Sequence, residues 1–331
     1  MQVHPFSVTL APPLQTAAGP MRHRRGFVVR RRVGDVVGIG EATPLRGWTE
    51  SLSACAAALA GDRPVDPRLT PAAHHALELA TVVAEARAAE ESVATHLGAP
   101  ATARVPVNAT VGLAAPPQVA TAVSEAVDAG YGTVKIKLAG EHADVDRLAA
   151  AVDVAGDVRI RGDCNGAADR ATANAICAAG ADLGVEFIEQ PLPPSDLAGI
   201  EALAEIGCPI AVDEGLLEHE VSALADAGVA VIICKPMVLG GPRRLLRIAT
   251  SADAAGITTV VTSTYDAVIA RTAAVHLAAA VGGPHAHGVA TGGRVLGDIA
   301  PDPLRVCEGT VSIGAEAGLG GLTAFRYDSG A

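Results

Sequence analysis

Residues 132–138 read Gly-Thr-Val-Lys-Ile-Lys-Leu, an apolar run that carries two lysines, Lys135 and Lys137. Thr, Val and Ile favour a β-strand, and residues two apart on a strand point to the same face. The only other lysine, Lys235, ends the apolar run 229–235, and every remaining basic residue is arginine. Arginine stays protonated, whereas a lysine amine can lose its proton. Unless codon bias alone explains them, the three lysines indicate a buried site that takes and returns protons.

Similar short β-rich runs recur from about residue 104, separated by Ala-rich helical stretches. Eight strands that alternate with helices are typical of an α/β fold of the (β/α)8 type, a modified TIM barrel. A doubly wound sheet is the alternative, but it usually has fewer such units. No Gly-x-Gly-x-x-Gly follows the first strand, so nothing supports dinucleotide binding. The predicted strands are 104–112, 132–138, 158–163, 185–190, 209–213, 229–235, 257–263 and 285–291. The predicted helices are 117–129, 143–155, 169–182, 196–206, 218–227, 241–255 and 266–281.

The first hundred residues lack this regular alternation of strands and helices. Residues 3–10 and 26–41 alternate like antiparallel strands, and helices are expected over 49–60 and 71–97, with Thr49 and Thr70 as N-caps. The Gly-rich stretch near the C-terminus reads as a return to this first unit. We therefore expect an α+β capping domain at 1–100, a barrel at 101–302 and a completing C-terminal segment at 303–331.

Composition narrows the class of protein. A formal net charge of −11 argues against nucleic acid and an anionic membrane surface as partners. No apolar run reaches the roughly 20 residues that span a bilayer, and the start has no basic-then-apolar leader. The six cysteines form no Cys-x-x-Cys pair and read as buried free thiols of a reducing compartment. We expect a cytoplasmic protein, with a homo-oligomer left open.

Three acids, Asp163, Glu189 and Asp213, end successive predicted strands, where barrel enzymes keep their chemistry. Facing carboxylates repel one another unless a cation joins them. Oxygen ligands suit Mg²⁺, with Mn²⁺ an alternative. Lys137 and Lys235 then flank the metal. A small-molecule carboxylate bound between them would carry a more acidic α-proton, which a lysine could remove.

These motifs, in order and spacing, resemble the enolase superfamily in its muconate-lactonising subgroup. The matching pieces are Lys135-x-Lys137, Asp163-x-Asn165, Glu189-Gln190-Pro191, Asp213-Glu214 and Lys235. The resemblance implies that the three acids ligate magnesium and that Lys137 is the acid/base, with Lys235 opposite it. It further implies that Lys135 tunes Lys137, while Asn165 and Glu214 support the ligands and Lys235.

Within this subgroup the chain most resembles the o-succinylbenzoate synthases. The features are Arg161 before Asp163, Ser263-Thr264 on strand seven, Gly292-Gly293 beyond strand eight, and the segment 40–48. The resemblance implies substrate contacts at Arg161, Ser263, Thr264 and Gly292. It also implies dehydration of 2-succinyl-6-hydroxy-2,4-cyclohexadiene-1-carboxylate in menaquinone biosynthesis.

Other readings stay open. N-acylamino acid racemases, dipeptide epimerases and muconate cycloisomerases share the lysine pair, although dipeptide epimerases carry an Asp-x-Asp on strand eight that 285–291 lacks. A catalytically idle barrel that serves as a binding module is the non-enzymatic alternative. Specificity is expected in loops 12–25 and 42–50, where Arg22 and Arg24 could attract a second carboxylate. His285 and His287 are expected to be structural or surface residues.

Overall fold

A parallel sheet of seven strands, in the order β11-β10-β9-β8-β7-β6-β5, forms the centre of the computed structural model, which describes residues 1–16, 19–322 and 325. Isolated bridges from Thr262 to Gly288 and from Val107 to His287 join its two edges. The result is an α/β fold like a TIM barrel. The strands are β5 (Ala109–Val111), β6 (Thr133–Lys137), β7 (Arg159–Asp163), β8 (Phe187–Glu189), β9 (Ile210–Val212), β10 (Val231–Cys234) and β11 (Thr258–Val261).

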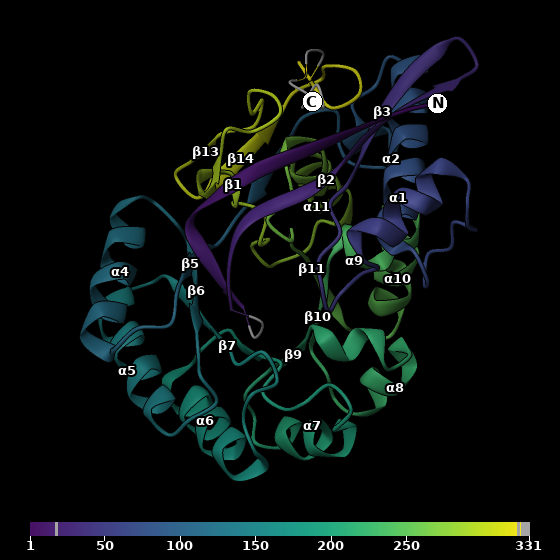
Figure 1. Ribbon diagram of the computed structural model, residues 1–331. Helices are drawn as coiled ribbons and strands as arrows, with labels where there is room; N and C mark the ends of the chain where they lie inside the picture. The colour runs from purple at the N-terminus through teal and green to yellow at the C-terminus, as the bar shows by residue number, and fades with distance from the viewer. Residues whose placement is uncertain (17–18, 323–324, 326–331) are drawn as a thin grey trace.

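Helices cover the outside of this sheet, and α4 to α8 follow it around in Figure 1. They are α4 (Pro116–Asp128), α5 (Ala143–Ala155), α6 (Arg170–Leu183), α7 (Leu197–Ala204), α8 (Val221–Asp226), α9 (Pro236–Leu239), α10 (Pro242–Ala254) and α11 (Val268–Val281), with 3-10 turns η1 (Glu214–Leu217) and η2 (Gly292–Arg294). A large aliphatic core lies between strands and helices. A second, small core of Phe187, Ala211, Val231, Ile233 and Val260 comes from the strands alone, because side chains alternate between the two faces of each strand.

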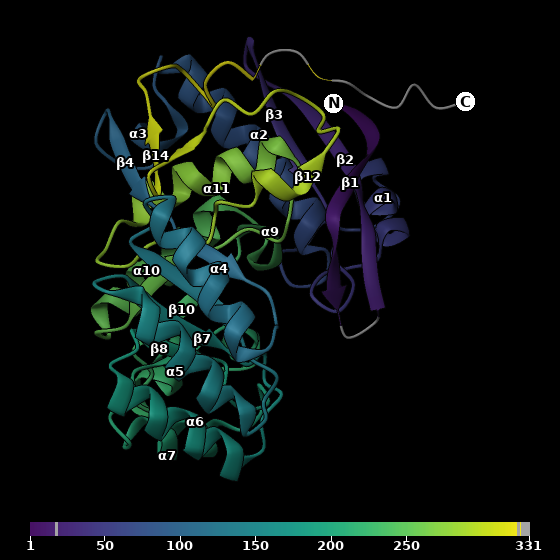
Figure 2. The same ribbon diagram turned by 90° about the vertical axis from the view of Figure 1, so that its left-hand side faces the viewer.

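The N-terminal unit is built on a second sheet, in the order β12-β1-β2-β3, which Figure 2 shows beside the barrel. Its strands are β1 (Gln2–Thr16), β2 (Gly19–Val33), β3 (Val36–Ala42) and β12 (Val295–Leu296), and its helices are α1 (Leu52–Ala60), α2 (Pro71–Ala88) and α3 (Val93–His96). Gly38 and Gly40 let β3 approach α2, since a Cβ at either position would lie within 2 Å of a helix carbonyl oxygen. Leu319 and Leu322 pack in the same core as Phe6 and Val8.

The C-terminal stretch adds β13 (Val306–Cys307) and β14 (Thr310–Ile313), and β14 pairs with β4 (Ala103–Pro106). Residues 17–18 of the expected specificity loop, and residues 323–324 and 326–331 of the expected C-terminal segment, lie outside the described residues.

The expected first strand, 104–112, is in fact two strands with different partners. β4 pairs antiparallel with β14, whereas β5 enters the barrel beside β6. Between them Val107 and Asn108 donate their amides to Gly309 and His287. The expected eighth strand, 285–291, is only a pair of bridges. Gly288 passes so close to Thr262 that a Cβ there would lie 2.7 Å from its Cγ2, so close backbone contact replaces a continuous ladder.

The start of α1 differs from expectation, whereas α2 starts where expected but without the expected side-chain cap. Ser51, rather than Thr49, caps α1 by accepting the amide of Ala54. Thr70 does precede α2, but its side chain makes no cap hydrogen bond. Glu50 instead accepts the amides of Ala72 and Ala73, a favourable place for a carboxylate because the helix N-terminus is electropositive.

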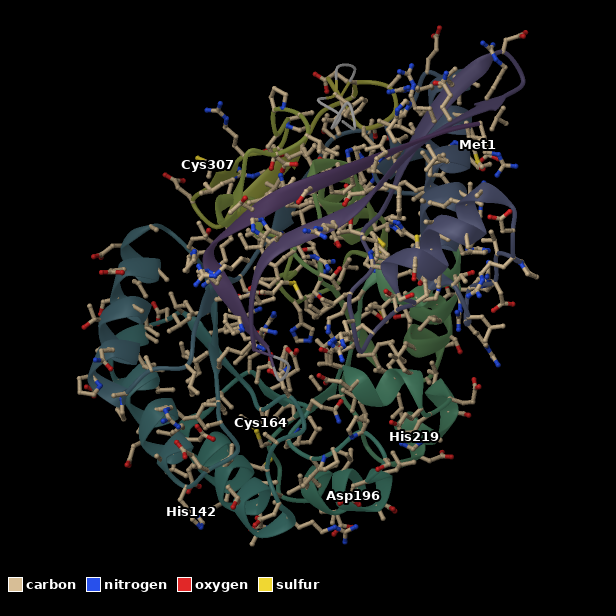
Figure 3. The ribbon with its side chains drawn as sticks, in the orientation of Figure 1. Met1, His142, Cys164, Asp196, His219 and Cys307 are labelled. Atoms are coloured by element: carbon tan, nitrogen blue, oxygen red, sulfur yellow. The ribbon has the colours of Figure 1, made fainter. Side chains whose placement is uncertain are left out.

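Five of the six cysteines are buried free thiols, and the sixth, Cys307, is exposed, contrary to the expectation for all six. Figure 3 shows Cys164 inside the ring of helices and Cys307 at the edge of the molecule. Within the described residues, every helix is too short or too polar to cross a lipid bilayer.

Candidate active site at the barrel mouth

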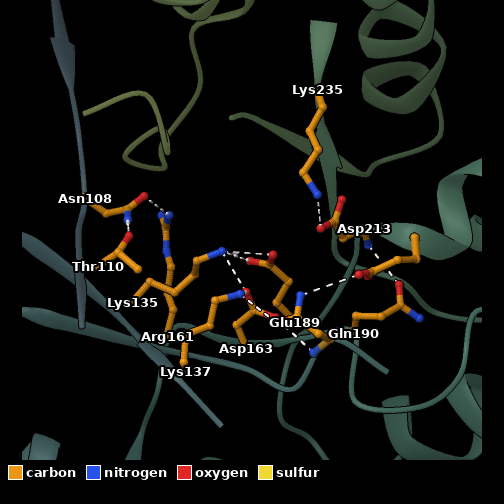
Figure 4. A network of polar contacts seen from close by, with 12 residues as sticks. Asn108, Thr110, Lys135, Lys137, Arg161, Asp163, Glu189, Gln190, Asp213 and Lys235 are labelled. Carbon is orange, nitrogen blue, oxygen red and sulfur yellow. Dashed lines mark hydrogen bonds and ion pairs between the residues drawn. The ribbon is translucent and has the colours of Figure 1, made fainter. Parts of the chain in front are cut away.

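Strand register brings the acids and lysines together. Lys137 on β6 is level with Asp163 on β7, which is level with Glu189 on β8. Asp213 follows β9 directly, and Lys235 follows β10. Figure 4 shows Lys135 and Lys137 reaching these acids from one side and Lys235 from the other. Neighbouring parallel strands thus place their acidic and lysine side chains at the same end of the barrel.

Lys135 joins two of the acids. Its Nζ lies 2.9 Å from Oδ2 of Asp163 and 3.0 Å and 3.1 Å from the two carboxylate oxygens of Glu189. Asp163 is fully buried and Glu189 is 2% exposed. Burial acts to lower the pKa of Lys135, but Asp163 and Glu189 outweigh it, and the pKa is raised above its usual value. The two carboxylates therefore favour the protonated form of Lys135.

Lys137 is the more exposed of the two β6 lysines, with about a third of its side chain accessible. Its Nζ donates to Oδ2 of Asp163 at 2.6 Å and to Oδ1 of Asn165 at 2.7 Å. Asn165 holds a left-handed φ of 47° and donates its own amide to Asp163. Asn165 thereby holds both the lysine and the acid.

Lys235 donates a short hydrogen bond to Oδ2 of Asp213. Gln190 fixes the backbone of this acid, because its Oε1 accepts the amides of Asp213 and Gly215 at 3.0 Å each. Glu214 lies beside them, with Oε1 3.5 Å from Nδ2 of Asn165. The sequence prediction gave Gln190 no role, although its place directly after Glu189 was the available signal.

The three acids differ in their protonation equilibria. Burial and then Asp163 raise the pKa of Glu189 to about 7. Burial raises that of Asp213 to about 6, although Lys235 opposes the shift. The pKa of Asp163 is instead held below its usual range, because Lys135 and Lys137 outweigh burial. Burial thus disfavours the ionised forms of Glu189 and Asp213, whereas the lysines favour the ionised form of Asp163.

The chemistry of the three acids fits a divalent cation, which would favour their ionised forms. The three carboxylates offer only hard oxygen donors, which match the preference of Mg²⁺. Among residues 1–16, 19–322 and 325, no three His, Cys, Asp or Glu side chains are already grouped closely enough to hold an ion. Asp163, Glu189 and Asp213 would therefore have to turn from their lysine partners to bind a metal together.

Trp48, a site residue that sequence reasoning missed, reaches the barrel mouth from the N-terminal unit. Its ring centroid lies 3.7 Å from Nζ of Lys235. The signal was that Trp48 is the only tryptophan of the chain and lies within the segment 40–48. A small cavity lies here, lined by Trp48, Asp213, Leu216, Leu217, Ile233, Lys235, Val238 and Leu239.

Arg161 does not lie where a substrate contact was expected. It is 1% exposed and lies one layer below Asp163, level with Lys135 and Phe187. Its guanidinium bonds Glu186 and the carbonyl oxygen of Ala286 and lies 4.5 Å from the Phe187 ring. Because residues two apart on β7 share a face, Arg161 points into the barrel as Asp163 does. Its side chain lies in the barrel interior, below the mouth.

The other expected contacts are also engaged within the protein. Oγ of Ser263 lies 2.7 Å from Oγ1 of Thr291, and Thr264 donates from both its amide and its hydroxyl to Asp266. Gly292 packs against the pair of Arg271 and Asp302, and a Cβ there would lie 2.9 Å from that aspartate. Ser263 and Thr264 lie just after β11, at the mouth end of the barrel. Their hydrogen bonds go to Thr291 and Asp266 and not to the lysines.

Arg24 is likewise unavailable for a second carboxylate. It is 2% exposed and donates to the carbonyl oxygens of Thr43, Pro44 and Tyr265. Arg22, two residues earlier on the same strand, is exposed.

The two histidines have structural contacts, as expected. His285 bridges Glu186 and Thr258 at 2.8 Å and 3.0 Å. His287 is 2% exposed and accepts the amide of Val261 on Nδ1, while burial lowers its pKa to about 4. Both side chains tie the eighth segment to its neighbours.

Comparisons with known proteins place this site in context. Residues 118–321 match the family described as enolase C-terminal domain-like. The o-succinylbenzoate synthase of Thermobifida fusca is 36% identical over 234 residues, which cover 66% of this chain and 70% of that protein. The L-Lys-D/L-Arg epimerase of Methylococcus capsulatus is 31% identical over 352 aligned positions, covering 93% and 96%.

A solved structure agrees over the whole fold. The dipeptide epimerase of Methylococcus capsulatus, in complex with Mg and the dipeptide L-Arg-D-Lys, superposes with a TM-score of 0.87. It is 28% identical in sequence, and the match covers 98% of each chain.

Proposed function

This chain belongs to the enolase superfamily, and we propose that it is a Mg²⁺-dependent enzyme that moves a proton next to a substrate carboxylate. Asp163, Glu189 and Asp213 would hold the cation, which when bound stabilises the negative charge that develops on that carboxylate. The observation that carries the proposal is the pair of lysines, Lys137 from β6 and Lys235 from the end of β10, that approach the three acids from opposite sides.

The reaction we propose is the o-succinylbenzoate synthase reaction, on 2-succinyl-6-hydroxy-2,4-cyclohexadiene-1-carboxylate. Lys137 removes the proton α to the ring carboxylate, and the electron pair enters an enediolate. The same lysine then returns a proton to the departing hydroxyl group on the same face, so that water leaves and the ring becomes aromatic. Lys235 remains a cation that stabilises the enediolate.

Two observations support this substrate. The synthase of Thermobifida fusca shares 36% identity with the chain. Dehydration needs one base, and the structure treats its two lysines unequally: Lys137 contacts Asp163 and Asn165, whereas Lys235 lies between Asp213 and an aromatic ring.

The second candidate is epimerisation of a dipeptide. The observation that favours it is coverage, because the epimerase of Methylococcus capsulatus matches 93% of this chain and superposes over nearly all of it. In that reaction both lysines would act as bases, one on each face of the α-carbon.

One pair of assays separates the two. Purified protein with Mg²⁺ is given the succinyl-cyclohexadiene carboxylate, and the loss of diene absorbance is followed in the ultraviolet. In parallel, the protein is incubated in D₂O with L-Arg-L-Lys and L-Ala-L-Glu, and α-deuterium is measured by mass spectrometry. The synthase proposal predicts diene loss that stops on chelation. Deuterium uptake with an unchanged diene would replace it with the epimerase.

A further inference from the structure

The contact between Trp48 and Lys235 joins two separate parts of the fold. Trp48 belongs to the segment between β3 and α1, whereas Lys235 lies at the mouth of the barrel. The indole ring attracts a cation through the negative potential of its face, but it accepts no proton. It can therefore hold an ammonium group in place without competing for the proton that the group carries.

Trp48 is presented by a rigid turn. The amides of Trp48 and Thr49 both donate to the carbonyl oxygen of Leu45, and Oγ1 of Thr49 accepts the amide of Leu45 at 2.8 Å. Gly47 lies in the left-handed region, with φ +89°, where a side chain would be strained. Beyond the turn, Glu50 and Ser51 accept amides at the starts of two helices. The turn is thus anchored on both sides.

Arg24 fixes the incoming end of this turn to the barrel. It donates to the carbonyl oxygens of Thr43 and Pro44 at 2.7 Å and 2.8 Å, just before the turn begins. It also donates to the carbonyl oxygen of Tyr265, and it lies 3.6 Å from the carboxylate of Asp266. Tyr265 and Asp266 follow β11, so one buried guanidinium connects the Trp48 turn to the barrel strand next to β10.

Lys235 has two partners, and the proposed function removes one of them. Asp213 accepts its hydrogen bond in the structure, but Asp213 is also a proposed ligand of Mg²⁺. A carboxylate drawn to a cation has less charge to offer an ammonium group. The ring of Trp48 then becomes the remaining partner that keeps Nζ from swinging away from the site.

We propose that Trp48 is a positioning residue, which holds the ammonium group of Lys235 in its working place when the metal is bound. This rests on the proposed proton-transfer function of the site. It assigns to the N-terminal unit a role in aligning the barrel's own catalytic group, in addition to covering the mouth.

Activity gives the first test. Trp48→Ala should lower kcat about tenfold, within a range of about three- to thirtyfold, with KM changed less than about twofold. Trp48→Phe, which keeps a weaker ring face, should lose less. Tyr131→Ala removes a half-buried aromatic side chain at the opposite end of the barrel and controls for general loss of packing. Equal losses in Trp48→Ala and Trp48→Phe, or an effect confined to KM, would overturn the proposal.

Fluorescence gives a test that needs no turnover. Because Trp48 is the sole tryptophan, emission excited at its absorption edge reports this ring alone. A cation against the ring should quench and shift that emission, so wild type and Lys235→Met should differ, while wild type and Tyr131→Ala should not. Where Lys235→Met does not fold, Lys235→Gln replaces it. Identical spectra of wild type and the Lys235 variant would show that the contact is absent.

The two tests also separate this inference from the function on which it rests. The kcat comparison uses whichever of the two proposed reactions the wild-type protein catalyses. If it catalyses neither, the proposed function fails, while the fluorescence comparison still decides whether Trp48 holds Lys235.

Discussion

Lys137 and Asp163 lie opposite each other in the register of β6 and β7, and their Nζ and Oδ2 atoms are 2.6 Å apart. The proposed base is therefore hydrogen-bonded to a proposed metal ligand. A cation that binds Asp163 would compete with this bond and release the lysine toward substrate. Metal binding and the readiness of the base are coupled through one carboxylate oxygen.

The first prediction concerns that base. Lys137→Arg keeps the positive charge but cannot deprotonate, so kcat should fall by about 10² to 10⁴. Mg²⁺ binding, measured by calorimetry, should change little, because the charge beside Asp163 is retained. A variant that keeps more than about a tenth of the wild-type kcat would show that Lys137 is not the base.

The second prediction concerns the cation. A ligand that binds only the folded state stabilises it, by about 2.7 kcal/mol at a hundredfold excess over its Kd. Mg²⁺ should therefore raise the urea midpoint of the wild type. Glu189→Gln should lose most of this gain, because an amide is a weaker ligand than a carboxylate. Glu186→Gln, which alters an acid of the same strand region outside the proposed ligand set, is the matched control and should keep it. An undiminished gain in Glu189→Gln would remove Glu189 from the ligand set.

The third prediction concerns pH and Glu41. This carboxylate is fully buried and accepts the amides of Ala267 and Ala270. Burial and then Asp266 raise its pKa from 4.5 to about 7. The folded protein thus binds this proton more tightly than the unfolded chain does, so the associated stability is present below pH 4.5 and is lost as pH rises to about 7.

Glu41→Gln should abolish that change. The difference in unfolding free energy between the variant and wild type should move in favour of the variant by on the order of 3 kcal/mol between pH 4.5 and 7. Glu90→Gln, at an exposed position, should give a flat difference. Chemical denaturation at several pH values measures both, and a flat difference for Glu41→Gln would contradict the prediction.

The fourth prediction concerns His285. His285→Ala should cost about 1–3 kcal/mol of stability, because it removes one hydrogen bond from Glu186 and one from Thr258, which keep Arg161 and the carbonyl oxygen of Ala230 as their other partners. Its kcat should stay within about twofold of wild type, since the histidine belongs to the barrel's closing segment. A large loss of kcat in a folded variant would instead connect His285 with catalysis.

The barrel and its acids were predictable because strand period and unit spacing fix which residues end each strand. Asp163 and Glu189 become neighbours once β7 and β8 pair in register. The closing segment at 285–291 was harder, since its hydrogen bonds come from isolated bridges that leave no alternating pattern. The depth of Arg161 was also not predictable, because it depends on how many layers of side chains lie between Phe187 and the mouth.

Contacts between distant segments could not be read from the sequence. The ring of Trp48 and the amine of Lys235 are separated by most of the barrel along the chain, and no local pattern links them. The same holds for Arg24, whose charge suggested a substrate contact. Its hydrogen-bond acceptors are backbone carbonyl oxygens, which every residue type offers, and its ion-pair partner Asp266 lies far away in the sequence.

The sheet of the N-terminal unit is assembled from both ends of the chain, since β12 pairs with β1 and Leu319 packs in the core with Phe6. On the ribosome, β1 to β3 emerge before the barrel and must wait for these partners until nearly all of the barrel has been synthesised. The sheet of the N-terminal unit is thus completed only after the barrel strands have been synthesised. We expect activity to appear only after the segment that follows the barrel has been synthesised, so a nascent chain stalled within the barrel would remain inactive.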